Sequence, residues 1–516
     1  MKAKSLRTTA GCVALILISG CRPLADEGGG SGPIVIGTAN VLTHLDPAGA
    51  YDNGSWALYN NVYQSLLTFE SGSPVPRPDA AEECEFTDSG LMTYRCLLRD
   101  GLKFSNGNAV TAAAVKHSFD RIMRINDPLG PGPLLANLKS VEAHGSTVTF
   151  RLKTADATWP SKIATGAGSI VDPAVYPPDE LRGDRGVTGS GPYLISHQSE
   201  NRIDLEPNPA YQGAVPRGKA MPIRIRYYQQ AKDVEAAWKD GTVDVAYRGL
   251  PAKTLAGLDE NTPGMRLSIG QSAEAHYLAI NLRRKDNPLA RVAARRAVAT
   301  LVDRGGLAGK VHGRTVTPLY SLIPQGITGH STAFFDAYPE VDPERAKSLL
   351  RSAGLPTPAR FTLGHQNGIA ALEAKELERQ LEAGGAFEVT LVEEADWPTY
   401  QRRYARGDFD AFITGWSPDF PDPETFTQPL IGSDSVLSNG FSSSEVNTAI
   451  RLTQQQTDRG LTREQFRGIQ RSIAQSVPLV PLWQNKDYVV TRPHVSGGQY
   501  LADGTGVWRL WELGLL

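Results

Sequence analysis

The chain has 516 residues, of which 41% are hydrophobic and 21% are charged, and its formal net charge is −2 at pH 7. This length and composition suit two or three domains with a large core. The net charge is near neutral, without the excess of basic residues that is typical of nucleic-acid-binding proteins, so no nucleic-acid partner is expected.

The N-terminus has the features of an export signal. Lys2, Lys4 and Arg7 form a positive region, and an apolar run from Cys12 to Ile18 follows. This run is too short to span a bilayer and has the flanks of a signal peptide. We therefore expect residues 1–20 to be removed on export.

The apolar run ends in Ile18-Ser19-Gly20-Cys21, which matches the lipobox of bacterial lipoproteins. Cys21 is the expected lipidation site, and an ordinary secretory signal cleaved nearby is the alternative. Cleavage removes three positive charges and leaves a net charge of about −5. Because no second apolar run of 18 or more residues follows, we expect an exported protein anchored to the outer face of the cell membrane, on the cell-wall side or in the periplasm.

Two cysteines remain after export, Cys84 and Cys96. They lie equidistant from Gly90, within the turn signal Asp88-Ser89-Gly90, so a hairpin centred there places them face to face. An exported chain favours a disulfide between them. The alternative is two small buried hydrophobic residues.

Hydrophobic periodicity and capping signals predict alternating strands and helices after a flexible Gly/Ser-rich tether at 21–33. The expected strands cover 34–37, 148–152, 203–205, 223–227, 243–246, 276–281, 388–392, 409–414 and 488–491. The expected helices begin at Ser55, Thr111 and Pro343 or cover 232–239, 290–303, 370–383, 397–406 and 463–476, and a loop is expected from Leu363. This alternation implies an α/β protein with a partly parallel sheet.

The most informative stretch is Gly415 to Pro423, with the sequence GWSPDFPDP. A strand should stop abruptly before it, because the prolines continue neither a strand nor a helix. Trp416 and Asp419 then stand on a stiff turn, where an indole face and a carboxylate suit a ligand with a cationic amine beside apolar bulk. The alternative is a strand end with a buried Trp and solvated aspartates.

The order of several segments resembles the solute-binding lipoproteins of peptide-type ABC importers, the dipeptide/oligopeptide/nickel-binding family 5. The resemblance covers nearly the whole mature chain. It is carried by Leu45-Asp46-Pro47, Ser89-Gly90-Leu91, Leu98 to Gly107, Thr111 to Phe119, Gly189 to Tyr193, Asn208 to Tyr211, Asp240 to Val245, Arg291 to Ala297 and Gly415 to Pro423.

The resemblance implies a two-lobed periplasmic-binding-protein fold (type II, large cluster C-like) with an extra α+β subdomain inserted in the first lobe. The expected divisions are a signal peptide at 1–20, a tether at 21–33, lobe I at 34–75, 188–272 and 488–516, the inserted subdomain at 76–187, and lobe II at 273–487. Closure of the lobes over the ligand is then a hinge motion.

The resemblance also implies the site and the function. Asp419 is expected to hold the ligand's α-amino group, and Trp416 to line a side-chain pocket. The candidate ligand-binding residues are Asp419, Trp416, Gly415, Ser417, Tyr51, Asn53, Tyr277, Trp483 and Gln484. The expected function is to capture short peptides or peptide-like amines and deliver them to the transmembrane subunits of an ABC permease, as a monomer without cofactor, metal or enzymatic activity.

The sequence departs from the family pattern three residues before Trp416. Oligopeptide-binding members can carry an Arg there for a ligand carboxylate, and this chain has Ile413. The possible substitutes are Arg402, Arg403 and Arg406, which are otherwise solvated helix charges.

Proteins of the same fold can bind other classes of solute, and these remain alternatives to a peptide ligand. An oligosaccharide would use aromatic stacking, with Tyr51, Trp483 and Gln484 as candidates. Nickel, a metal chelate or haem would use histidines such as His44, His276 and His365, although lone histidines more often pack or face solvent. A signalling or adhesion lipoprotein that serves no importer is a further alternative.

An exported hydrolase is the alternative from another class. The sequence has no Gly-x-Ser-x-Gly, His-Glu-x-x-His or Cys-x-x-Cys pattern. Gly305 to Val311 superficially resembles a phosphate loop, but its spacing is one residue short and Val311 replaces the Ser or Thr. We expect a helix end there instead.

Overall fold

The computed structural model describes residues 32–216, 220–433, 435–502 and 507–516. The signal peptide, Cys21 and the tether up to residue 31 lie outside the described residues. Within those ranges, no helix has both the length and the apolar character that a membrane crossing requires.

A mixed sheet of eleven described strands runs through the protein. In sheet order they are β15 (Phe387–Glu393), β14 (Ala359–His365), β16 (Ala411–Trp416), β12 (Arg266–Ile280), β17 (Leu479–Thr491), β11 (Val245–Tyr247), β1 (Ile34–Thr38), β10 (Ile223–Tyr227), β9 (Arg202–Pro207) and β8 (Tyr193–Gln198), and β13 (Val316–Pro318) also pairs with β17. β1 is parallel to β10 and β11, and β14 is parallel to β15 and β16. The predicted partly parallel sheet is confirmed.

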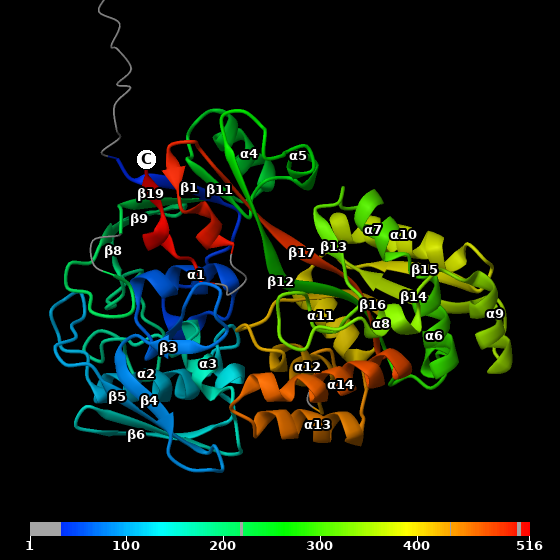
Figure 1. Cartoon of the computed structure of the whole chain (residues 1–516), viewed down its shortest axis with the longest axis horizontal. Helices are drawn as coiled ribbons and strands as arrows, with labels where there is room; N and C mark the ends of the chain where they lie inside the picture. Colours follow the sequence, from blue (N-terminus) through cyan, green and yellow to red (C-terminus); the bar gives the residue numbers. More distant parts are fainter. Residues whose placement is uncertain (1–31, 217–219, 434, 503–506) are drawn as a thin grey trace, which may run out of the picture. The chain divides into compact units, whose positions relative to one another are not determined.

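Two long antiparallel strands, β12 and β17, connect the two halves of this sheet (Figure 1). Their pairing register is broken between Gln271 and Ala275, so the ladder is interrupted midway along both strands. A bulge of this kind locally disrupts the ladder and bends the strand. We call this break the hinge.

Two large hydrophobic cores lie on either side of the hinge. The first draws its buried side chains from residues 34–247 and 489–513, together with Phe420. The second draws them from residues 273–483. We call the two packed bodies lobe I and lobe II. In lobe II, Tyr277 to Ile280 are fully buried, as expected for a strand that is covered on both faces.

A four-stranded antiparallel sheet extends lobe I, with the order β4 (Ala81–Phe86), β5 (Thr93–Leu98), β7 (Thr147–Leu152) and β6 (Leu138–His144). Helix α2 (Ala112–Ile125) packs on it and begins as predicted at Thr111, whose side chain accepts a hydrogen bond from Ala114 N. Cys84 lies directly opposite Cys96, with Cα atoms 4.1 Å apart, and a disulfide joins them.

Helices cover the rest of both lobes. In lobe I they are α1 (Asn53–Val62), α3 (Trp159–Ile163), α4 (Ala231–Lys239) and α5 (Ala252–Leu255). In lobe II they are α6 (Val292–Leu301), α7 (Arg304–Lys310), α8 (Ala333–Ala337), α9 (Pro343–Ser352), α10 (Ile369–Glu382), α11 (Trp397–Arg406), α12 (Glu424–Ile431), α13 (Ser444–Gln454) and α14 (Arg463–Ser476). Lobe I also has the short pairs β2 (Leu67–Phe69) with β3 (Pro76–Pro78), and β18 (Val495–Ser496) with β19 (Gly514–Leu515).

Two local expectations need correction, and a third is confirmed. The loop expected from Leu363 is wrong, because Leu363 is fully buried inside β14. Helix α1 begins before Ser55, because Asp52 rather than Ser55 caps it. The helix end expected between Gly305 and Val311 is present, because α7, which Asp303 caps, ends at Lys310.

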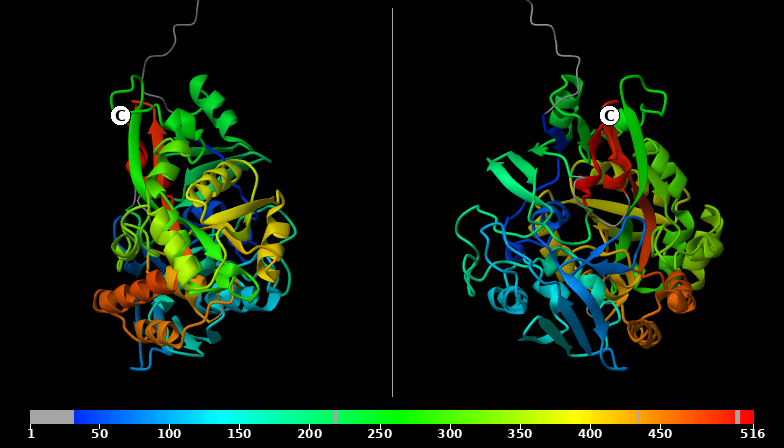
Figure 2. Two further views of the ribbon diagram at one scale, coloured as in Figure 1. Left: turned by 90° about the vertical axis from the view of Figure 1, so that its right-hand side faces the viewer. Right: turned by 60° about the vertical axis from the view of Figure 1, so that its left-hand side comes forward.

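The lobes contact each other beside α3. Ala157 N donates a hydrogen bond to Gln454 O at 2.8 Å. In Figures 1 and 2 the orange helices α13 and α14 accordingly lie next to the cyan segment that contains α3. This contact closes one side of the space between the lobes.

Candidate ligand-binding site

The loop from Ser417 to Pro423 leaves lobe II at the end of β16 and returns to it at the start of α12. Between these points Phe420 is buried in the core of lobe I, where it is 2% exposed. Asp419 is its neighbour in sequence. The anchored phenylalanine therefore holds the Asp419 carboxylate at the boundary between the lobes.

Asp419 is partly buried and accepts a hydrogen bond from the hydroxyl of Tyr51 in lobe I. Burial raises the pKa of Asp419 to about 6, and the negative charge of Glu424 adds to the rise. The Tyr51 hydrogen bond and the charge of Lys162 act in the opposite direction. The carboxylate is thus held in a poorly solvated place, where a cationic partner would favour its charged form.

One ammonium, Lys162 on α3, lies near Asp419 but is held elsewhere. Its Nζ contacts Asp156 Oδ2 at 2.7 Å. Although burial alone would lower it, the pKa of Lys162 is raised by the charges of Asp156 and Glu424. The charges of Asp156, Glu424 and Asp419 all act on this ammonium, while the nearby guanidinium of Arg459 pairs with Asp422 at 2.7 Å. Among these described residues carboxyl groups outnumber cations, which favours a cationic ligand.

A direct side-chain contact crosses the lobe boundary at the same place. The hydroxyl of Thr158 in lobe I lies 2.6 Å from Glu424 Oε2 in lobe II and 2.7 Å from Asp156 Oδ1. Gln454 Nε2 donates to the other oxygen of Glu424 at 3.0 Å. Glu424 is therefore fixed from both lobes.

Trp416 is the last residue of β16, not a residue of the turn. Its indole Nε1–H donates to Thr425 O at 2.6 Å, and the ring packs on the lobe II core while staying partly exposed. The hydrogen bond fixes the ring orientation, so the exposed part of the indole is a rigid apolar surface three residues from Asp419.

Gly415 lies opposite His276 on β12 and is exposed. A Cβ at this position would stand 2.9 Å from His276 Nε2, so a larger residue would displace the imidazole. Ser417 follows Trp416 and is partly buried. The stretch from 415 to 419 thus forms one wall of the site.

The loop that carries Tyr51 is fixed by a buried ion pair. Arg121 on α2 and Asp46 are each 1% exposed at the side chain, with Nη1–Oδ1 and Nη2–Oδ2 distances of 2.6 and 2.5 Å. Tyr51 itself packs against Trp56, with ring centroids 5.2 Å apart. Asn53 begins α1 and is exposed.

Three of the candidate residues are buried in the protein interior and do not face the space between the lobes. Tyr277 is fully buried and donates to Leu322 O at 2.7 Å. Trp483 is 4% exposed, stacks under His276 and donates to Glu373 Oε1 at 3.0 Å. Gln484 is fully buried and bonds the backbone of Gln325. Tyr277 stands in an expected strand, and Trp483 and Gln484 stand at the end of an apolar run. Neither signal distinguishes a core face from a cleft face.

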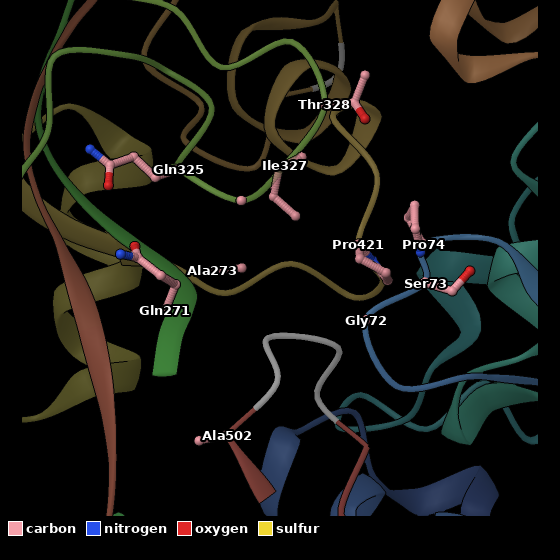
Figure 3. Close-up of a pocket in the computed structure, with 11 residues that line it drawn as sticks. Gly72, Ser73, Pro74, Gln271, Ala273, Gln325, Ile327, Thr328, Pro421 and Ala502 are labelled. Atoms are coloured by element: carbon pink, nitrogen blue, oxygen red, sulfur yellow. The ribbon is translucent and has the colours of Figure 1, made fainter. Parts of the chain in front are cut away.

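A cavity of about 180 Å³ lies beside this wall, between the lobes (Figure 3). Lobe I contributes Gly72 to Pro74 and Ala502. Figure 3 shows Gly72 to Pro74 across the space from Gln271 and Gln325, whereas Ala502 lies on the side of Gln271. Its full lining is Gly72, Ser73, Pro74, Gln271, Ala273, Gln325, Gly326, Ile327, Thr328, Pro421 and Ala502. Gln484 forms hydrogen bonds with Gln325 and Gln271 and thereby fixes two residues of the cavity lining.

The alternative ligand groups are dispersed. His44 accepts a hydrogen bond from Asp46 N, His276 covers Trp483, and His365 is buried. Within the described ranges, no group of three or more His, Cys, Asp or Glu side chains is arranged to hold a metal ion.

The three arginines considered as substitutes for the family arginine form hydrogen bonds with residues close to them in sequence. Arg402 contacts Thr399, Arg403 contacts Glu394 and Arg406 contacts Asp408, all on or beside α11. Ile413 is 5% exposed and belongs to the lobe II core.

Sequence reasoning missed Asp156, Thr158, Lys162 and Glu424. These residues are distant in sequence from Asp419 or follow it in a Pro-rich stretch, where no periodic pattern marks them. The one available signal was the density of polar side chains just before Trp159-Pro160, at the start of α3.

Known proteins match this chain over most of its length. Residues 75–437 match the model of the bacterial extracellular solute-binding proteins, family 5 Middle. The chain belongs to the family 5 solute-binding proteins. The relatives below share its length and fold.

The probable D,D-dipeptide-binding periplasmic protein DdpA of Escherichia coli K12 is 26% identical over 482 residues, covering 90% of each chain. Heme-binding protein A of Haemophilus influenzae is 26% identical over 498 residues, covering 89% of this chain and 88% of its own. The solved structure of clavulanic acid biosynthesis oligopeptide binding protein 2 superposes with a TM-score of 0.82 at 24% identity, covering 94% of this chain and 95% of its own. The two-lobed fold expected from the sequence is confirmed.

Proposed function

We propose that this solute-binding protein captures short peptides or peptide-like amines between its lobes and delivers them to the permease of an ABC importer. The observation that carries the proposal is the Asp419 carboxylate. It is partly buried at the lobe boundary, is bonded by Tyr51 of lobe I, and stands beside the fixed indole of Trp416. An enclosed ammonium–carboxylate contact there contributes about 1.5–3 kcal/mol to binding.

The wider assembly follows from the sequence and the family. We propose that Cys21 carries the lipid anchor outside the cell, that the protein is a monomer, and that the division into lobe I, inserted subdomain and lobe II has the boundaries given above. The two hydrophobic cores and the separate four-stranded sheet support this division. The D,D-dipeptide relative supports a peptide-like ligand.

Isothermal titration calorimetry with di- to pentapeptides tests the amine site. Asp419→Asn keeps the shape and hydrogen-bonding capacity of the side chain but removes its charge, and we expect peptide affinity to fall by about 2–5 kcal/mol. N-acetylated peptides should bind wild type weakly and show little change in the variant. Equal affinity of a free-amine peptide for both proteins would remove Asp419 from the amine site.

Haem, nickel chelates and oligosaccharides form the comparison panel, because a relative is named for haem binding. Native mass spectrometry of protein purified without added ligand identifies what it carries. Exclusive binding of one of these solutes would overturn the peptide proposal while leaving the family assignment intact.

A further inference from the structure

A second cavity, of about 410 Å³, lies where lobe I meets the hinge. Its lining includes Asn53, Arg248, Leu250, Leu255, Glu274 and Asp487. We call it the hinge cavity. It is larger than the cavity of Figure 3, and it has an ionic side and an apolar side.

The ionic side carries two carboxylates, Asp487 and Glu274, and two cations, Arg248 and Lys486. Arg248 has a φ of 48°, a left-handed conformation that is rare for a residue with a side chain. Its Nε and Nη2 bind the two oxygens of Asp487, each at 3.1 Å, so this guanidinium and this carboxylate neutralise each other. Glu274 is the carboxylate of the lining that is not bound by the guanidinium, and its Oε1 lies 3.2 Å from His276 Nε2.

Glu274 is ionised and accessible. Burial alone would raise its pKa, but the hydrogen bond with His276 and the charge of Arg248 lower the pKa of Glu274 to about 2. Its side chain is 33% exposed. The other cation of the lining, Lys486, directs its Nζ to Arg314 O at 3.2 Å.

The apolar side consists of Ala246, Leu250, Leu255 and Gly249. Leu250 and Leu255 belong to a small hydrophobic cluster that packs under this surface. A chain of methylene groups can lie along such a surface while its charged end stays in a polar place. The hinge cavity therefore has the dimensions and chemistry for an alkyl cation.

The cavity is adjacent to the proposed amine site on both walls. In lobe I, Asn53 is two residues from Tyr51, which spans at most about 7 Å of extended chain. In lobe II, Glu274 is two residues from His276, which lies opposite Gly415. A peptide with its amine on Asp419 thus has the hinge cavity within reach of one of its first side chains.

We propose that the hinge cavity is a side-chain subsite for lysine or arginine, with Glu274 as the carboxylate that pairs with the ligand's cation. This inference rests on the proposed function, because it places the ligand's amine at Asp419. It makes the protein selective for basic short peptides. Neutral peptides bind at the amine site without filling the subsite.

Matched peptides test the proposal by calorimetry at pH 8, above the usual titration range of histidine. Lys-Ala-Ala, Ala-Lys-Ala and Ala-Ala-Lys are each compared with the same peptide carrying Nε-acetyl-lysine, which keeps the stem and removes the charge. For at least one pair we expect wild type to prefer the lysine form by about tenfold or more. Glu274→Gln should abolish this preference.

The control Glu206→Gln makes the same charge change at an exposed position of β9 and should keep the preference. Leu255→Lys is an independent variant, because it places a tethered ammonium beside the cavity and should remove the preference even if Glu274→Gln folds poorly. Equal affinities within all three wild-type pairs, or a preference that survives Glu274→Gln and Leu255→Lys, would overturn the subsite.

Failure of the proposed function gives a different result. If wild type binds none of the six peptides, both proposals are overturned. If Asp419→Asn weakens every peptide but no pair shows a lysine preference, only the hinge subsite is overturned.

Discussion

At the scale of single residues, the proposed amine site at Asp419 makes ligand binding depend on the protonation of one carboxyl group. Its carboxyl group is held where burial raises its pKa to about 6, and Tyr51 and Lys162 only partly offset that effect. In the proposed function, a ligand ammonium binds the ionised form. Protons and ligand therefore compete for the same oxygen atoms.

The first prediction is that peptide affinity falls as the pH is lowered. With a pKa near 6 in the free protein, about one tenth of the Asp419 side chains are ionised at pH 5, so affinity should be about tenfold weaker than at pH 8. Calorimetry across this range checks it, and proton uptake or release is read from buffers of different ionisation enthalpy. Asp419→Asn should show a flatter profile; an identical slope in both proteins would assign the pH dependence to another group.

The second prediction concerns the buried pair of Asp46 and Arg121, which supports the loop that carries Tyr51. Arg121→Met leaves the Asp46 carboxylate buried without its partner, so the free energy of unfolding should fall by about 3–5 kcal/mol. Arg124→Met on the same helix breaks an exposed pair with Asp179 and should cost less than about 1 kcal/mol. Urea denaturation measures both free energies of unfolding. Similar losses in the two variants would show that burial does not determine how much an ion pair stabilises this protein.

At the scale of elements, the sequence predicted helices and strands correctly where the hydrophobic periodicity was strong. The helices at 397–406 and 463–476 were predicted with the observed bounds, because their amphipathic periods are strong. Strand β14 was missed, because the glycine and histidine at its end read as a loop although all of Leu363 to His365 is buried. Local pattern cannot report burial that distant segments create.

The candidate site shows the same limit. The turn from Gly415 to Asp419 was predicted as a local feature, and the structure places Tyr51 beside it. The residues around Lys162 and Glu424 were not predicted, since they meet only after the two lobes pack. Tyr277, Trp483 and Gln484 were candidates for the cleft, and three-dimensional packing buries their side chains.

The third prediction belongs to the hairpin of β4 and β5. Replacing Cys84 and Cys96 by alanine removes a cross-link with a sequence separation of 12 residues and should lower the free energy of unfolding by about 2–3 kcal/mol. Denaturation of the variant is compared with wild type, with and without reductant. A non-reducing digest of wild type should contain the cross-linked peptide, and a digest without it would contradict the assignment.

At the scale of the whole molecule, the polar contacts between the described lobes include that of Tyr51 with Asp419 and that of Thr158 with Glu424. Closure of two lobes around a ligand requires that the closed arrangement gain free energy from such contacts. A ligand amine on Asp419 and the Thr158 hydroxyl on Glu424 would act together to hold the lobes closed.

The fourth prediction is that Thr158→Val weakens peptide binding by about three- to tenfold, because it removes one hydrogen bond from the closed state. Small-angle scattering should show less compaction on adding ligand than in wild type. Thr448→Val, on the exposed side of α13, is the matched control and should bind normally. Unchanged affinity in Thr158→Val would mean that this contact does not contribute to closure.

Strand β17 pairs with β12 in both lobes and with β11 in lobe I, although it begins only at Leu479. The sheet of a chain still being synthesised therefore lacks one of its inner strands until nearly all codons have been translated. Neither half can be produced as a separate, complete fragment by cutting the gene at the hinge.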